Sequence, residues 1–275
     1  MTKKAKRRPN RGNRRGWLVS PKQIKVWFRQ AEQQLVEEDF RGVKITCRRI
    51  LKYVPADSTV YGDAQSYLGI ACAMSQDHAG AYSAFTAALA IFPERSDLWY
   101  NRGLASHFTM RMGQAVRDLE RAVALETNSK MLAEYQKALQ FSWDMARQEM
   151  AFRGPDFTLE ELITQQELFQ QGLQKMAGQK WTAAEDIFRQ VIALGDVHPQ
   201  PWGNLAGSLI MQGRFDEAET ALRQALKMDP DYDMARQNLA ILPQLRKSGP
   251  PRHFSIRSPF EEQEVSGSLM FWEED

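Results

Sequence analysis

The chain has 275 residues, of which 43% are hydrophobic and 25% are charged, the composition of an ordinary soluble protein. No stretch approaches the roughly 18 apolar residues of a membrane-spanning helix, and the basic N-terminus lacks the apolar run of a secretory signal. Two cysteines, Cys47 and Cys72, are too few for a disulfide framework, so we expect two small buried side chains in a cytoplasmic protein.

The net charge of +2 conceals a strong asymmetry between the two ends of the chain. Residues 1–25 contain ten Lys or Arg and no acid, whereas residues 258–275 contain six acids and no base. Residues 1–19 have almost no apolar side chain before Trp17, and 248–275 are rich in Pro, Ser and Glu. Such segments bury too little surface to repay the entropy of ordering, so we expect two disordered termini, the first basic and the second acidic.

The first predicted helix pair begins with a capping signal. Ser20-Pro21 combines an N-cap residue with a proline in the first turn. Apolar residues three and four positions apart then predict one helix up to about Leu35 and a second helix from about Phe40 to Tyr53.

The next two segments, 62–95 and 96–129, repeat this two-helix pattern and follow each other without a gap. Each has a small residue where its two helices would cross closely, Gly69 in the first and Gly103 in the second. Residues 129–152 then carry one apolar stripe on a single long helix, and no second helix follows in phase. We interpret this helix as a cap, because the end of a stack of repeats must be covered.

A Gly-Pro dipeptide at 154–155 marks a strong break in the chain. Thr158 followed by Glu161 is a capping-box signature, which predicts the start of another long helix. Two further copies of the two-helix pattern occupy 165–198 and 199–232, again without a gap.

The last copy, PQPWGNLAGSLIMQGRFDEAETALRQALKMDPDY, is the clearest of five, and the copy at 24–57 is the weakest. The copy at 199–232 places Trp202, Ala206, Ala218 and Pro230 in a pattern that resembles the tetratricopeptide repeat, W-x2-L-G-x2-Y…A-x3-F…P. The resemblance implies an all-α fold, a solenoid of about five helical hairpins in two blocks with capping helices and disordered termini. The expected domains are a basic tail (1–19), a first block of three repeats and a cap (20–152), a second block of two repeats and a cap (157–247) and a flexible acidic tail (248–275).

No constellation of catalytic or metal-binding residues is visible. The four histidines lack the spacing that would bring two of them to one metal ion. There is no Gly-rich phosphate loop and no nucleophile motif. We therefore expect no catalytic residue, no metal site and no cofactor, and a protein that is not an enzyme.

Members of this family bind peptides or helices of partner proteins in a concave groove lined by the first helices of successive repeats. The resemblance therefore implies a non-catalytic adaptor or scaffold with an apolar groove. Its expected residues are Ile70, Met74, Tyr100, Asn101, Leu104, His107, Phe108, Phe169, Leu173, Met176, Asn204, Ile210 and Met211. The alternative is that the capping helices cover some of these positions.

Asn101 and Asn204 match one position of the clamp with which some family members hold the C-terminal carboxylate of heat-shock chaperones. The basic partners of that clamp are missing, since Leu104, Phe169 and Gly203 stand where polar or cationic residues are needed. We therefore exclude this ligand.

The basic N-terminal tail indicates a different class of function. Lys and Arg bind phosphates and displace counterions, which gives affinity without sequence choice. The cations of the tail are Lys3, Lys4, Lys6, Arg7, Arg8, Arg11, Arg14 and Arg15. The alternative function is thus an RNA- or ribosome-associated protein anchored by this tail, and the simplest interpretation of the tail is a solubilising segment.

The C-terminal sequence SLMFWEED places an apolar run, 269–272, among acids. Acid-flanked aromatic residues at a chain end resemble the short peptides that grooves of this family accept. We expect this segment to dock weakly on an apolar groove of its own chain or of a neighbouring molecule, and in the second case to promote self-association. The alternatives are a role for a different protein and an inert end.

Overall fold

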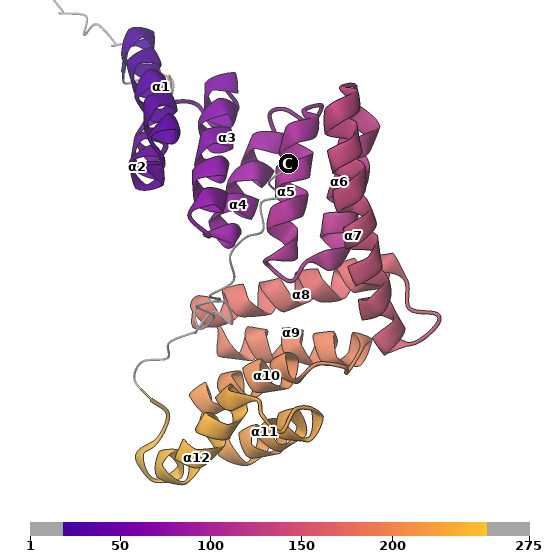
Figure 1. The fold of residues 1–275 in the computed structure, drawn as a ribbon. Coiled ribbons are helices and arrows are strands. Elements are labelled where there is room, and N and C mark those ends of the chain that lie inside the picture. The colour runs from indigo at the N-terminus through magenta and orange to yellow at the C-terminus, as the bar shows by residue number, and fades with distance from the viewer. Residues whose placement is uncertain (1–18, 252–275) are drawn as a thin grey trace, which may run out of the picture. The chain divides into compact units, whose positions relative to one another are not determined.

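The computed structural model of the protein describes residues 19–251. Within them it contains twelve α-helices and no strand, which confirms the predicted all-α fold (Figure 1). The helices are α1 (Pro21–Val36), α2 (Phe40–Leu51), α3 (Thr59–Met74), α4 (His78–Leu89), α5 (Ser96–His107), α6 (Met112–Leu125), α7 (Ser129–Arg153), α8 (Leu159–Ala177), α9 (Trp181–Leu194), α10 (Pro199–Met211), α11 (Phe215–Met228) and α12 (Asp233–Ser248). The basic residues predicted for the N-terminal tail and the apolar C-terminal run lie outside the described residues.

Consecutive helices pack as hairpins, and the hairpins stack on one another. In the first part of the chain α1 packs on α2, α3 on α4 and α5 on α6, and the hairpins contact each other through α2–α3, α4–α5 and α6–α7. Figure 1 shows these helices lying side by side. In the second part α9 packs on α10, α10 on α11 and α11 on α12. This arrangement confirms the predicted solenoid of helical hairpins.

The predicted capping signals fix where two of the helices begin. The Ser20 hydroxyl accepts a hydrogen bond from the backbone N–H of Gln23 at 3.3 Å, at the start of α1. At the start of α8, Thr158 Oγ1 accepts from the Glu161 N–H at 3.2 Å, and Glu161 Oε2 accepts from the Thr158 N–H at 2.8 Å. Both halves of the capping box are therefore present, and they satisfy N–H groups that a helix leaves without partners.

The turn inside each of the five repeat hairpins passes through the left-handed backbone region. The residues in this conformation are Glu38 (φ 58°), Gln76 (60°), Met110 (56°), Gln179 (55°) and Gly213 (75°). The conformation costs a non-glycine residue about 1–2 kcal/mol. Four of the five turns therefore tolerate this cost, because the packing of the flanking helices determines the turn.

The two helices of a hairpin approach most closely where the first carries a glycine. A Cβ atom on Gly69 of α3 would lie 2.6–2.8 Å from the Phe85 ring of α4, and a Cβ on Gly172 of α8 would lie 2.7 Å from the Phe188 ring of α9. Both phenylalanines are buried at 1% exposure or less. The pattern of a glycine in the first helix and a phenylalanine in the second thus records a direct contact between them.

A buried ion pair joins α5 to α6. Arg102 donates from Nε to Asp118 Oδ2 at 2.7 Å and from Nη2 to Oδ1 at 2.6 Å, and Asp118 is fully buried. Gln114 donates a further hydrogen bond to Asp118 Oδ1 at 2.6 Å, and the guanidinium carbon of Arg102 lies 4.7 Å from the Trp99 ring centroid. A buried carboxylate is costly without such partners, so these hydrogen bonds compensate for the burial of Asp118.

Both cysteines are free and buried, as the sequence predicts. Burial raises the pKa of the Cys47 thiol to about 12 and that of the Cys72 thiol to about 11. Both thiols therefore stay protonated at neutral pH, and the protonated thiol is neither the nucleophile nor the metal ligand.

The chain divides into two compact units, residues 1–163 and 164–275, with the boundary inside α8. The helix α7 ends at the predicted Gly-Pro break, but the next helical turn still belongs to the first unit. Leu162 is fully buried in a cluster with Val116 of α6 and Ala146 of α7, and Ile163 is 3% exposed. The first unit therefore extends beyond residue 152, because the start of α8 covers apolar surface on α6 and α7. Whether blocks 20–152 and 157–247 fold alone stays a prediction.

Candidate functional site

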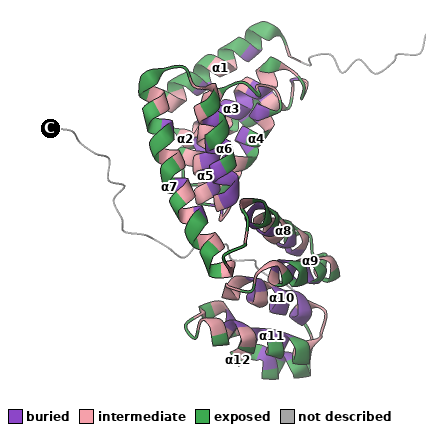
Figure 2. Cartoon of the chain, turned by 90° about the vertical axis from the view of Figure 1, so that its right-hand side faces the viewer, coloured by how far each residue is buried: buried purple, intermediate pink, exposed green. Residues whose placement is uncertain are grey.

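The predicted groove residues of the first unit lie on α3 and α5, and Phe108 directly follows α5. Met74 and Phe108 are exposed, at 57% and 50%. The other five are half-buried, namely Ile70, Tyr100, Asn101, Leu104 and His107. Figure 2 shows exposed residues along α1 and α7 and buried residues gathered on α3 to α6.

The long helix α7 contacts several of these positions. The Tyr100 ring stacks on the Tyr135 ring of α7 with centroids 4.2 Å apart, and the Tyr100 hydroxyl donates to Glu134 Oε1 at 2.8 Å. Burial and this hydrogen bond both raise the pKa of Tyr100. Asn101 is directed to its own helix, since its Nδ2 donates to the Asp97 carbonyl at 2.8 Å. The capping helix thus covers part of the predicted groove, as the alternative interpretation allowed.

His107 is held between α6 and α7. Its Nε2 lies 2.7 Å from the Ser142 hydroxyl of α7, and its Nδ1 lies 3.4 Å from the Met112 sulfur of α6. Burial lowers the pKa of His107, so the ring is neutral at neutral pH. The histidine therefore contributes a fixed, uncharged ring at the edge of the covered region.

Four aromatic side chains, partly exposed, lie around the end of α5. We call His78, His107, Phe108 and Phe141 the aromatic strip. The rings of His78 and Phe108 stack with centroids 4.0 Å apart and an interplanar angle of 12°. The rings of His107 and Phe141 lie 5.5 Å apart at 55°. Because His107 and Phe108 are adjacent in sequence, the two ring pairs lie at the same end of α5, one against the start of α4 and the other against α7.

Sequence reasoning missed two members of the aromatic strip. Phe141 is 59% exposed and lies outside the apolar stripe of α7, between a glutamine and a serine. A phenylalanine outside the apolar face of a helix was the available signal for a surface role. His78 is the first residue of α4, and nothing in its sequence context indicates that it stacks on Phe108.

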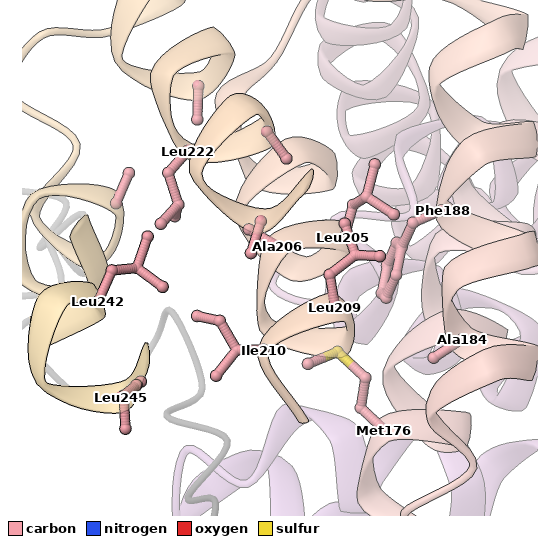
Figure 3. Close-up of a cluster of buried hydrophobic side chains, with 14 residues drawn as sticks. Met176, Ala184, Phe188, Leu205, Ala206, Leu209, Ile210, Leu222, Leu242 and Leu245 are labelled. Carbon is pink, nitrogen blue, oxygen red and sulfur yellow. The ribbon is translucent and has the colours of Figure 1, made fainter. Parts of the chain in front are cut away.

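In the second unit, two predicted groove residues belong to the core. Met176 and Ile210 are each 2% exposed and lie in the buried cluster of Figure 3 together with Leu205. Leu242 and Leu245 of α12 belong to the same cluster, so the second capping helix covers this end of the predicted groove. The remaining predicted positions of this unit, Phe169, Leu173, Asn204 and Met211, are half-buried.

Residues 19–251 contain neither a metal-binding cluster nor a membrane-spanning helix. In that range no three His, Cys, Asp or Glu side chains are grouped so that they would hold a metal ion. None of the helices described is both long and apolar enough to cross a membrane.

Comparison with known proteins relates the hairpins of the second unit to a family. The family model described as Tetratricopeptide repeat matches residues 175–241, from the end of α8 into α12. No curated protein matches the chain.

Similar solved structures include the TPR domain of P58(IPK), with 12% identity over 82% of this chain and 66% of that one and a TM-score of 0.44. The TPR2AB domain of yeast Sti1, solved in a complex with pHSP90, has 14% identity over 83% of this chain and 86% of that one and a TM-score of 0.38. PilF of Pseudomonas aeruginosa has 14% identity over 83% of this chain and 93% of that one and a TM-score of 0.34.

Proposed function

We propose that the chain belongs to the tetratricopeptide repeat family, whose model matches residues 175–241, and that it is a non-catalytic cytoplasmic adaptor that binds a peptide or helix of a partner protein. The binding surface we propose is the aromatic strip of the first unit with the adjoining half-buried positions of α3 and α5. The partner contributes an apolar segment. Burial of that segment against the aromatic strip supplies most of the binding free energy.

The exposure of Phe108 and Phe141 is the observation that carries this proposal. The exposed fractions of Phe108 and Phe141 are 50% and 59%. Phe108 nevertheless stacks on the His78 ring, and Phe141 contacts the His107 ring at an angle; both histidines are half-buried. Large aromatic side chains are enriched in interfaces, because they bury much surface and lose little conformational freedom. Rings that are already held by neighbours lose still less freedom on binding, so the strip is preorganised.

The electrostatics of the aromatic strip favour an apolar ligand at neutral pH. Burial lowers the pKa of both His78 and His107, and for His78 it outweighs the opposing charge of Asp77. Neutral imidazole rings present no net charge, so the two histidines add no charge beside the exposed rings of Phe108 and Phe141. Met74 of α3, at 57% exposure, is the other exposed residue of the predicted groove in this unit, and methionine adapts its shape to a bound segment.

The proposal is tested by comparing the proteins that the full-length chain captures from a lysate of its source organism. The double variant Phe108→Ser with Phe141→Ser should lose specific partners about tenfold, which corresponds to about 1.4 kcal/mol of binding free energy. Quantitative mass spectrometry measures the loss for each captured protein.

The matched control is Val36→Ser with Phe152→Ser, which removes two side chains of the same unit that are 86% and 68% exposed and lie outside the aromatic strip. This variant should capture the same proteins as the unmodified chain. If the strip variant keeps every partner while its circular dichroism spectrum is unchanged, the aromatic strip is not the binding surface.

A further inference from the structure

The first helical hairpin contains a pocket that the proposed function does not use. Its volume is about 460 Å³, within the range of pockets that hold small ligands. It lies on α1 and α2 and the residues that follow them, and its lining residues are Trp27, Ile45, Arg48, Arg49, Lys52 and Tyr53. We propose that this pocket binds single-stranded nucleic acid, with phosphates on its three cations and an unstacked base against its aromatic rings.

The charge of α2 is the first observation behind this proposal. The helix FRGVKITCRRIL carries four Arg or Lys and no acid, and no acid occurs between Asp39 and Asp57. Arg48, Arg49 and Lys52 are exposed, and no carboxylate of the described residues forms an ion pair with any of them. Three neighbouring cations repel one another, so a ligand that carries several negative charges along its length is stabilised there.

Most arginines outside this hairpin are used differently. The arginines at 95, 102, 117, 121, 147, 153, 189, 214, 223, 236 and 246 each form an ion pair with a carboxylate of the chain. The cations of the pocket are thus distinguished by the absence of acids around them as well as by their number.

The aromatic rings are the second observation. Trp27 and Tyr53 lie with ring centroids 5.7 Å apart, and the guanidinium carbon of Arg49 lies 5.6 Å from the Trp27 centroid. Trp27 packs on the buried residues Ile24 and Ile50, so its position is fixed by the core. Bases of single strands stack on such rings, and bases inside a duplex do not reach them.

The N-terminal sequence supports the same ligand. The chain enters α1 at Pro21, about 10 Å along the helix from Trp27. Residues 1–18, which lie outside the described residues, contain eight Lys or Arg and no acid. A polyanion on the pocket therefore has further cations available from the segment that leads into it. An acidic peptide would use the charges, and residues 258–275 of this chain combine acids with aromatic side chains, so this segment is the competitor that the test includes.

The test uses the full-length chain and a fluorescently labelled single-stranded RNA of twelve uridines, with binding measured by anisotropy at several salt concentrations. The pocket variant is Arg48→Gln with Arg49→Gln. It should weaken binding about tenfold or more and lower the slope of log affinity against log salt by about 1.4, the value for two phosphate contacts on a single strand. The charge-matched control, Arg29→Gln with Arg41→Gln, changes exposed arginines of the same hairpin outside the pocket lining and should weaken binding much less.

Two aromatic variants separate stacking from charge. Tyr53→Leu should weaken binding about 5-fold or more while it leaves the salt slope unchanged, because a base loses its stacking partner but no phosphate contact is lost. Trp27→Leu should do the same, and its melting temperature shows whether the hairpin is still folded. Deleting residues 2–15 should weaken binding but leave a remainder that the pocket variant then removes.

Competing probes decide between ligands. Single-stranded DNA of the same length tests whether the sugar matters, and a double-stranded RNA should bind more weakly than either single strand. The proposal is overturned if the chain binds no oligonucleotide at about 50 mM salt, where phosphate contacts are strong. It is also overturned if the pocket variant binds like the unmodified chain, if duplex binds as tightly as single strands, or if a peptide of residues 258–275 binds the pocket more tightly than RNA.

Discussion

At the scale of single residues, glycines in the first helix of a hairpin determine how closely the second helix packs. Gly172 of α8 leaves no room for a Cβ atom, which would lie 2.7 Å from the Phe188 ring. Alanine is the better helix former by about 1 kcal/mol, so on propensity alone the exchange would stabilise the protein. Overpacking a well-packed site costs about 1–3 kcal/mol, and Phe188 is fully buried.

We therefore predict that Gly172→Ala lowers the free energy of unfolding of the second unit by up to about 2 kcal/mol, the overpacking cost less the gain in propensity. Denaturant unfolding monitored by circular dichroism measures it. The control is Gly178→Ala, six positions on, where the nearest atom to an added Cβ is 3.4 Å away. Equal effects of the two substitutions would mean that the Gly172–Phe188 contact does not limit the packing.

A second residue-scale feature is the buried carboxylate of Glu185 in α9. Arg189 donates to its Oε1 from Nη2 at 3.0 Å, and Gln212 and Arg214 donate to its Oε2 at 2.9 and 2.5 Å. Burial alone would raise the pKa of Glu185, but the hydrogen bonds from Gln212 and Arg189 and the charge of Arg214 outweigh it and hold the pKa below its ordinary value. The folded protein therefore favours the ionised form more than the unfolded chain does.

Glu185→Gln should consequently lower the free energy of unfolding at pH 7 by about 1–2 kcal/mol, a value reduced because both arginines are partly exposed. A group with a lowered folded-state pKa stabilises the fold above its unfolded pKa, and that stabilisation disappears as the pH falls through the folded pKa. The difference between the two proteins should therefore shrink below pH 4.5, the ordinary value for Glu. Urea unfolding at several pH values measures it, with exposed Glu167→Gln as control. A difference that is independent of pH contradicts the assignment.

At the scale of elements, the repeat pattern predicted the helices well because it records contacts inside each hairpin. Gly69 against Phe85 and Gly172 against Phe188 are visible as residue types at a fixed spacing. The role of the first turn of α8 was not predictable in this way. Leu162 and Ile163 continue the helical periodicity of α8, and nothing in that periodicity shows that they pack on α6 and α7 of the first unit.

The first turn of α8 should stabilise the first unit when that unit is produced alone. A fragment of residues 1–163 should be more stable than a fragment of residues 1–152 by about 2–4 kcal/mol, because Leu162 and Ile163 are buried against it and each contributes about 1.5–3 kcal/mol before ordering costs. Thermal unfolding by circular dichroism measures the difference. The 1–163 fragment with Leu162→Ser is the control and should resemble the shorter fragment. Equal stability of the two fragments would place the end of the unit at residue 152.

At the scale of the whole molecule, the resemblance to the repeat family predicted the kind of fold but not which helices cover the predicted groove residues. Positions on the first helices were identified from their place in the repeat, yet Met176 and Ile210 are core residues and Tyr100 stacks under α7. Tyr100 is covered by α7, and Ile210 shares a buried cluster with Leu242 and Leu245 of α12; no repeat copy describes either helix. Phe141 was missed for the same reason, since it lies on such a helix.

The central claim is that the aromatic strip contacts a partner protein, and site-specific photocrosslinking tests it most directly. A photoreactive phenylalanine analogue placed at Phe141 reports which proteins lie within a few ångströms of the aromatic strip in living cells. The same analogue at Phe152, a more exposed position of the same helix, is the matched control. Our account predicts a specific crosslinked partner at position 141 and none at 152. Crosslinking at 152 without crosslinking at 141 would contradict it.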